Sequence, residues 1–213
     1  MLRGSIFILF VFIFKNLSAQ EKFTFYNTTN GLPSNHVYKC LADKKGFLWV
    51  ATENGLTRFD GVHFTNFTTK DGLSDNDILD IFLDKKDNLW VLPFNNKPVF
   101  VDATTFQIIN ATKNPELAKL NSKNILLGNT LSNGEIAFYD GAGNIFIWDK
   151  NKLKEKFKIK VNELKMYTKV NGADLAITEK SFLYRDKAGQ VIEKNSQQVS
   201  LLQLDLAKKM EIF

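Results

Sequence analysis

The sequence predicts an all-β protein, a segment of a β-propeller with about four blades of four antiparallel strands. Three observations predict this fold: a repeat of about forty residues, short apolar strands separated by Asp/Gly turns, and a high Phe content. The chain has 213 residues, of which 19 are Phe and 5 are Tyr, and large rings fill the cores of many all-β proteins. Four short strands in a unit of this length are typical of a propeller blade.

Composition excludes several classes of function. Cys40, His36 and His63 are too few ligands for a standard zinc site, and one Cys rules out a disulfide framework. We expect Cys40 to lie in the core. The net charge of +5 falls to +3 once Arg3 and Lys15 of a predicted leader are removed. This small, dispersed charge does not form the clustered basic surface that nucleic-acid binding requires. Local motifs for phosphate, acyl or metal chemistry are missing, so we expect no cofactor, metal or catalytic residue.

Residues 1–19 have the pattern of a signal peptide. Arg3 gives a positive start, residues 6–14 form an apolar run, and the small residues before the predicted cleavage point end at Ala19. Nine helical residues rise about 14 Å, which is too short for the roughly 30 Å hydrocarbon core of a bilayer. The alternative interpretation is a buried strand or helix. We therefore predict an exported, periplasmic protein with no membrane span within this chain.

An internal repeat relates residues 31–59 to residues 72–100 at a constant offset, because Gly72 follows Gly31 by 41 positions. Eleven of the 29 paired positions are identical. The pairs are Gly31/Gly72, Leu32/Leu73, Asn35/Asn76, Asp43/Asp84, Lys44/Lys85, Lys45/Lys86, Leu48/Leu89, Trp49/Trp90, Val50/Val91, Asn54/Asn95 and Phe59/Phe100.

The first unit, about 27–67, predicts four strands joined by turns. The strands are expected, in order, over residues 37–42, 47–52, 56–59 and 62–67. In the first turn the Asp43 carboxylate can accept backbone N–H bonds, and Gly46 tolerates a positive φ. Asn54-Gly55 marks the tip of the central hairpin, and Asp60-Gly61 forms the last turn.

The remaining units are expected at about 68–110, 121–160 and 164–200, and they become progressively degenerate. Residues 78–83 and the turn Asp84–Asp87 copy the first unit, whereas Trp148 is displaced from its expected place. Residues 115–123 are expected to be a helical or looped insertion, and residues 200–207 resemble the opening strand of a further unit. A closed ring has four to eight blades, so we expect the N-terminal part of a larger propeller.

Most repeated residues have expected structural roles. Trp49 and Trp90 are expected to pack between blades, although aromatic rings also stack on sugars. Asn35 and Asn76 are expected to cap the turn before each blade, and Arg58 to meet a carboxylate. The lysine pairs of the first turns are expected to be solvated. The structural positions of the repeat are Gly31, Leu32, Asn35, Asp43, Gly46, Trp49, Gly55, Phe59, Asp60, Gly61, Gly72, Leu73, Asn76, Asp84 and Trp90.

His36 and Asp77 are the candidate ligand-binding residues. They occupy one repeat position but differ between the two units, and they lie in loops, where specificity often resides. A glycosidase would need two carboxylates facing one sugar ring, and no Asp or Glu recurs in such a setting. The sequence therefore predicts a binding module rather than an enzyme.

The pattern GL-x-SN-x-V…D-x-x-G-x-LWV-x-T-x-x-GL-x-RFDG, from Gly31 to Gly61, resembles the two-component regulator propeller repeat. The second unit keeps most of this pattern but has residues 93–97 in place of the usual Gly-Leu hairpin. Proteins of this family are bacterial sensor histidine kinases with propeller repeats in the periplasm, and many respond to glycans.

The resemblance implies an extracytoplasmic sensor segment of a sensor histidine kinase, without the kinase part. Its implied partners are a small ligand, of which a glycan is one class, and the remaining receptor domains or a sensor kinase. Two alternatives stay open: a free-standing secreted propeller with a structural or interaction role, and an inactive truncated remnant.

Overall fold

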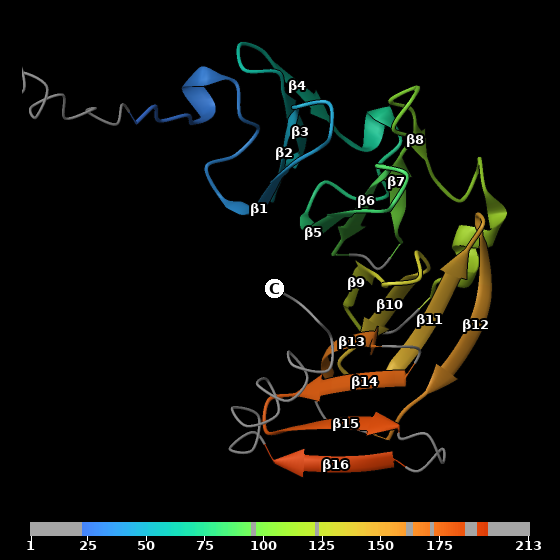
Figure 1. The fold of residues 1–213 in the computed structure, drawn as a ribbon. Coiled ribbons are helices and arrows are strands. Elements are labelled where there is room, and N and C mark those ends of the chain that lie inside the picture. The colour runs from blue at the N-terminus through green and yellow to red at the C-terminus, as the bar shows by residue number, and fades with distance from the viewer. Residues whose placement is uncertain are drawn as a thin grey trace, which may run out of the picture.

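The computed structural model describes residues 23–94, 97–121, 124–160, 164–170, 173–185 and 191–195. The predicted leader at 1–19 and the strand-like stretch at 200–207 lie outside the described residues. Within the described ranges, the strands form four separate sheets of four strands each, and all pairings are antiparallel (Figure 1). In these ranges no helix combines the length and the hydropathy that crossing a membrane requires.

Each sheet is built from four consecutive strands, and we call the sheets blades 1 to 4. Blade 1 holds β1 (Val37–Ala42), β2 (Leu48–Thr52), β3 (Gly55–Phe59) and β4 (Phe64–Phe67). Blade 2 holds β5 (Ile78–Leu83), β6 (Leu89–Pro93), β7 (Val99–Val101) and β8 (Ile108–Ile109). Blade 3 holds β9 (Leu126–Thr130), β10 (Ile136–Asp140), β11 (Asn144–Asp149) and β12 (Lys152–Lys158). Blade 4 holds β13 (Leu164–Val170), β14 (Ala173–Thr178), β15 (Ser181–Arg185) and β16 (Val191–Asn195).

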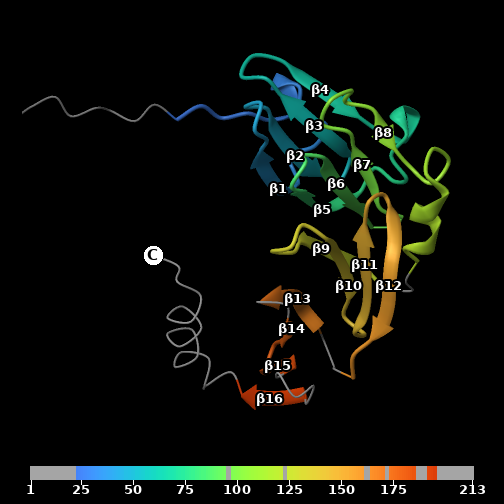
Figure 2. The same ribbon diagram turned by 45° about the vertical axis from the view of Figure 1, so that its right-hand side comes forward.

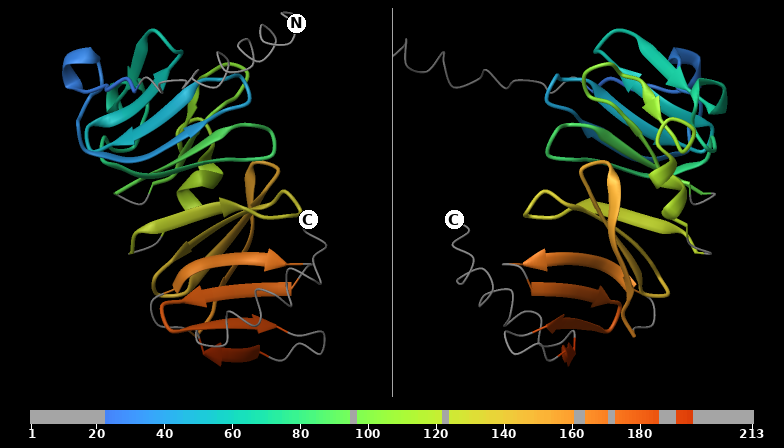
Figure 3. Two further views of the ribbon diagram at one scale, coloured as in Figure 1. Left: turned by 60° about the vertical axis from the view of Figure 1, so that its left-hand side comes forward. Right: turned by 90° about the vertical axis from the view of Figure 1, so that its right-hand side faces the viewer.

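The blades follow one another in chain order, with blade 1 at the top and blade 4 at the bottom of each turned view (Figure 2 and Figure 3). The first strands β1 and β5 contact each other, and so do β5 and β9. Short 3-10 helices occupy the connections: η2 (Thr28–Asn30), η3 (Thr69–Asp71) and η4 (Pro115–Lys119). The last of these is the insertion that the sequence predicts between blades 2 and 3.

The core lies between successive blades rather than inside any one of them. Trp49 and Leu56 of blade 1 pack with Ile81 and Val91 of blade 2 in one buried cluster. A second cluster, between blades 2 and 3, contains Trp90, Phe100, Phe138 and Trp148, and a third, between blades 3 and 4, contains Ile147 and Tyr167. Each sheet therefore buries its apolar faces only against its neighbours, as stacked repeat units do.

The structural register departs from the ungapped repeat by one residue after the central hairpin. Trp49 pairs with Arg58 across the central hairpin of blade 1, whereas Trp90 pairs with Phe100 in blade 2. Phe100 therefore takes the place of Arg58, and the pairing of Phe59 with Phe100 is wrong. The hairpin explains the shift: residues 50 and 57 pair seven positions apart in blade 1, but residues 91 and 99 pair eight apart in blade 2.

Among the described residues Arg58 forms no ion pair with a carboxylate, contrary to the sequence expectation. Its guanidinium lies over the rings of Phe47 and Phe106, 4.8 and 4.4 Å from their centroids, and 6.0 Å from that of Trp49. A planar guanidinium stacks well on aromatic faces. Because Phe106 belongs to the blade 2 segment, Arg58 contributes to packing between the two blades.

The lysine turns are not merely solvated, which corrects a second expectation. The Lys44 N–H donates to Asp87 Oδ2 at 3.1 Å, and Lys44 Nζ lies 3.5 Å from the Lys85 carbonyl oxygen. Lys85 Nζ in turn donates to the carbonyl oxygen of Ser132 in blade 3. The first Lys of each turn therefore reaches the corresponding turn of the next blade and links successive blades at one edge.

Cys40 is exposed, so the expectation that it lies in the core is wrong. It pairs with Val50 on β2 as Ile81 pairs with Val91 on β6. Ile81 is fully buried because blade 1 packs against it. Among the described residues no blade packs on the Cys40 side of blade 1, which leaves the thiol open.

Candidate functional site

A turn of one design precedes the first strand of blades 1 and 2. The 3-10 helices Thr28–Asn30 and Thr69–Asp71 each carry a capping box and end at a glycine. These glycines, Gly31 and Gly72, have φ of 116° and 111°, a region that residues with a Cβ rarely occupy. The repeated Gly is therefore required by the backbone at this turn.

Asn35 and Asn76 hold the two turns in the same way. Asn35 Oδ1 accepts the Thr28 N–H at 2.9 Å, and Asn76 Oδ1 accepts the Thr69 N–H at 2.9 Å. These bonds fix the start of each blade against the turn that precedes it. The next residue in the chain, the candidate ligand position, is therefore held in an equivalent place in both blades.

Asp43 and Asp84 organise the turn after the first strand. Asp43 Oδ1 accepts the N–H groups of Lys45 and Phe47 at 2.9 and 3.0 Å, and Oδ2 accepts the Trp49 indole N–H at 2.9 Å. Asp84 Oδ1 accepts the equivalent backbone bonds at 2.8 and 2.9 Å, but its Oδ2 accepts from the Asn88 side chain. Both carboxylates act within their turns, which is a structural role.

The other repeat positions are also structural. Leu32, Leu73, Trp49, Trp90 and Phe59 are buried. Gly46, Gly55 and Gly61 all have positive φ. Asp60 accepts the N–H groups of Val62 and His63 at 2.8 and 2.6 Å, and these two bonds are the main cause that lowers its pKa.

His36 lies at the start of blade 1 and is exposed. Its Nδ1 is 3.2 Å from Oε2 of Glu53, whose Oε1 accepts the Ser34 hydroxyl at 2.7 Å. The Ser34 bond, followed by that of His36, lowers the pKa of Glu53 and favours its charged form. Because the Ser34 hydroxyl donates to Glu53 and not to His36, these groups do not form a nucleophile–base pair of the serine hydrolase kind.

Tyr38 lies near both candidate residues. Its ring centroid lies 4.7 Å from that of His36, and the Asp77 carboxylate of blade 2 lies close enough to influence its pKa. Partial desolvation, followed by the Asp77 charge, raises the pKa of Tyr38. The β1–β2 register shifts between residues 37 and 39, and a bulge of this kind re-aims a side chain. The Tyr38 side chain is therefore a neighbour of both His36 and Asp77.

We call Ser34, His36, Tyr38, Glu53 and Asp77 the blade 1–2 cluster. Sequence reasoning found His36 and Asp77 but missed Tyr38 and Glu53. The same signal would have found both, because positions 38 and 53 also differ from their repeat partners, Leu79 and Phe94.

A second polar contact lies beside this cluster on the first strands. Lys39 Nζ is 2.6 Å from Asp80 Oδ1.

Tyr139 of blade 3 is a buried phenol. Burial, with a smaller contribution from the Asp80 charge, raises the pKa of Tyr139 to about 12. Tyr139 therefore stays protonated at neutral pH. The described residues hold no group of three or more His, Cys, Asp or Glu side chains placed to bind a metal ion.

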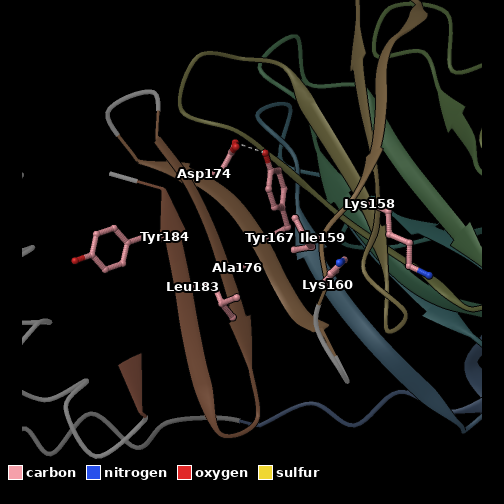
Figure 4. Close-up of a pocket in the computed structure, with 8 residues that line it drawn as sticks. All are labelled: Lys158, Ile159, Lys160, Tyr167, Asp174, Ala176, Leu183 and Tyr184. Carbon is pink, nitrogen blue, oxygen red and sulfur yellow. Dashed lines mark hydrogen bonds between the residues drawn. The ribbon is translucent and has the colours of Figure 1, made fainter. Parts of the chain in front are cut away.

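A separate cavity of about 340 Å³ lies between blades 3 and 4 (Figure 4). Its size falls within the range of small-molecule pockets. The Tyr167 hydroxyl donates to Asp174 Oδ1 at 2.6 Å within it. Burial, followed by this bond, raises the pKa of Tyr167. The described lining residues are Lys158, Ile159, Lys160, Tyr167, Asp174, Ala176, Leu183 and Tyr184.

Comparison with protein families gives two matches to the two component regulator propeller, at residues 31–54 and 72–95. Each match runs from the glycine of the turn before the blade to the end of the second strand or just beyond it. The first match includes His36, Tyr38 and Glu53, and the second includes Asp77. A search of the curated proteins gives no match.

Solved structures are similar in fold at low sequence identity. Virginiamycin B lyase from Staphylococcus aureus aligns over 77% of this chain and 57% of its own, at 15% identity and a TM-score of 0.58. PorZ of Porphyromonas gingivalis, a surface component of the type-IX secretion system, aligns over 75% of this chain and 22% of its own, at 13% identity and a TM-score of 0.55. The extracellular domain of a putative hybrid two component system from B. thetaiotaomicron aligns over 78% of this chain and 30% of its own. Its sequence identity is 17% and its TM-score is 0.49.

This chain thus spans 22% to 57% of the length of these three proteins. The first two likenesses establish the fold, and the family matches establish the repeat. Two consecutive segments of the chain therefore match the two component regulator propeller repeat, and they form the start of blades 1 and 2 in an all-β propeller fold.

Proposed function

We propose that this chain is the extracytoplasmic, ligand-perceiving segment of a two-component sensor protein. The observation that carries the proposal is the pair of family repeats at 31–54 and 72–95. In this proposal the leader at 1–19 is removed after Ala19 during export to the periplasm. Kinase activity resides in other domains, and the segment itself binds and does not catalyse.

The blade 1–2 cluster supports binding as its role. The Ser34 hydroxyl donates to Glu53, which also contacts His36, so that this hydroxyl is not set against His36 as a nucleophile. The exposed rings of His36 and Tyr38 offer a polar, aromatic surface at the start of blade 1. Aromatic faces beside hydrogen-bonding groups suit small polar ligands, sugars among them.

Tyr38 gives this cluster a route to a conformational response. Its ring belongs to blade 1, and the Asp77 carboxylate of blade 2 lies near enough to raise its pKa. A ligand that bridges His36 and Asp77 would favour one arrangement of the two blades over others. It would shift their equilibrium by its difference in affinity for the two arrangements.

The ligand can be sought with the purified chain, residues 20–213. Soluble oligosaccharides and other small polar compounds are screened by thermal melting, because a ligand of the native state raises the melting temperature. We expect His36→Ala and Asp77→Ala to abolish the shift that a true ligand gives. His63→Ala is the matched control, since His63 is also exposed and faces a carboxylate, Asp60, at 3.5 Å. Equal shifts in all three variants would contradict a role for the cluster.

The sensor role is tested in the source bacterium. Codons 20–213 are deleted in frame, and the transcripts induced by the identified ligand are measured. We expect the induction to be lost. Normal induction would overturn the sensor role and favour a free-standing interaction protein or an inactive remnant.

A further inference from the structure

The cavity between blades 3 and 4 has mostly apolar walls. Ala176 is buried on β14, the Tyr167 ring belongs to the third core cluster, and Leu183 packs against that cluster. Ile159, on the connection that leaves β12, packs against the same cluster. Figure 4 shows this connection on one side of Tyr167, with Ala176 and Leu183 on the strands at the other side. The walls therefore suit a flat, apolar body placed between the two blades.

The charged groups of the lining favour an anion. Lys158 and Lys160 are exposed, and none of the ion pairs formed by the described residues includes either of them. The one carboxylate of the described lining, Asp174, accepts the Tyr167 hydroxyl. The raised pKa of Tyr167 keeps that hydroxyl protonated at neutral pH, so it adds no negative charge. The described lining therefore holds two ammonium groups and one carboxylate, and the Tyr167 hydroxyl engages that carboxylate.

We propose that this cavity binds a small organic anion with a flat, apolar body. The acid group of the ligand lies near Lys158 and Lys160, and its body packs between Ile159 and the pair Ala176 and Leu183. A neutral sugar fits less well, because apolar side chains outnumber uncharged hydrogen-bonding groups in the described lining. The cavity is separate from the blade 1–2 cluster, so failure of this inference leaves the proposed function standing.

The test compares two fluorescent probes of similar shape on residues 20–213. The first, 1-anilinonaphthalene-8-sulfonate, is an anion, and the second, N-phenyl-1-naphthylamine, is its neutral counterpart. We expect the sulfonate to bind at one site and more tightly than the neutral probe. Added salt should weaken the binding of the sulfonate but leave the affinity for the neutral probe unchanged, because salt screens exposed charges.

Paired variants locate the site. We expect K158Q/K160Q to weaken the sulfonate about threefold to thirtyfold, the range of two partly exposed charge contacts. K150Q/K152Q removes the same charge from exposed positions of blade 3 and should leave the affinity unchanged. An intermolecular nuclear Overhauser effect between the bound probe and the Tyr167 ring would support the location. Equal affinities in both double variants, or no saturable binding to the folded chain, would overturn the proposal.

Discussion

Lys39 and Asp80 occupy the same place in successive repeats, 41 residues apart, and form an ion pair between the first strands of blades 1 and 2. Lys39 Nζ lies 2.6 Å from Asp80 Oδ1, and the Asp80 side chain is mostly buried whereas Lys39 is partly exposed. The repeat therefore places complementary charges at one position, where identical residues would repel or leave a buried charge unpaired. Divergence at this position stabilises the contact between the two blades.

A double-mutant cycle measures this contact. We expect the coupling free energy between Lys39→Met and Asp80→Asn to be about 0.5–1 kcal/mol, since one partner is exposed to solvent. Urea unfolding of the parent, both single variants and the double variant gives the value. Additive effects would show that the ion pair contributes nothing.

The two repeat tryptophans differ in their polar contacts, although both are only 1% exposed. The Trp49 indole N–H donates to Asp43 Oδ2, whereas the Trp90 Nε1 atom is buried without a hydrogen-bond partner, because Asn88 takes the Asp84 oxygen. Trp49→Phe loses a hydrogen bond to a charged group, while Trp90→Phe removes an unsatisfied donor. We expect Trp49→Phe to cost about 1–3 kcal/mol more unfolding free energy than Trp90→Phe.

Urea unfolding followed by circular dichroism measures this difference without relying on tryptophan fluorescence. Trp148→Phe gives a third buried tryptophan as reference. An equal cost for Trp49→Phe and Trp90→Phe would contradict the assigned role of the Asp43 bond.

The pair of Glu135 and Lys154 makes stability depend on pH in the acid range. The pKa of Glu135 falls below its ordinary value of 4.5, mainly because its carboxylate accepts a hydrogen bond from Lys154. A hydrogen bond from Asn133 makes a smaller contribution. A lowered carboxyl pKa contributes stability that is present above pH 4.5 and is lost as pH falls through the folded value. We expect Glu135→Gln to flatten the loss of melting temperature below pH 4.5.

Asp75→Asn is a control for this measurement, because its carboxyl group takes part in none of the ion pairs between the described residues. The contradicting result would be a parallel acid profile for Glu135→Gln and the parent.

At high pH the pair of Glu135 and Lys154 should lose its stabilising contribution as Lys154 gives up its proton. The raised pKa of Lys154, caused first by its bond with Glu135, makes the contribution disappear as pH rises through a value above 10.5.

The strands of blades 1 and 2 could be predicted because local signals determine them. Asp43 and Asp84 hold their turns by bonds within five residues along the backbone, and Gly31 and Gly72 need a positive φ. A pattern repeated at fixed spacing carries such local requirements directly. The fold class, the four strands of blade 1 and the first strand of blade 2 follow from them.

Contacts between blades could not be predicted in the same way. The positions of Arg58 over Phe106, and of Tyr38 against Asp77, depend on how one sheet sits on the next. One extra residue in the β6–β7 hairpin shifts Phe100 into the place of Arg58, and an ungapped repeat conceals this shift. The cavity between blades 3 and 4 arises where the repeat is most degenerate, so no shared residue marks it.

The open side of blade 1 yields a final prediction about Cys40. The equivalent side of blade 2 is closed by blade 1, with Ile78, Ile81 and Leu89 buried, whereas Val37, Cys40 and Leu48 are exposed. We expect the Cys40 thiol of residues 20–213 to react with a maleimide in native buffer within about tenfold of its rate in denaturant, since an exposed thiol needs no unfolding to react.

Cys40 also tests the proposal that this chain is part of a larger propeller, because a further blade packed on β1 would cover the thiol as blade 1 covers Ile81. Thermal melting of Cys40→Ile complements the labelling. The larger side chain should leave the stability of residues 20–213 within about 0.5 kcal/mol, as surface substitutions do. In a product with a covering blade, labelling should slow and follow unfolding. Slow labelling of residues 20–213 themselves would contradict the open side of blade 1.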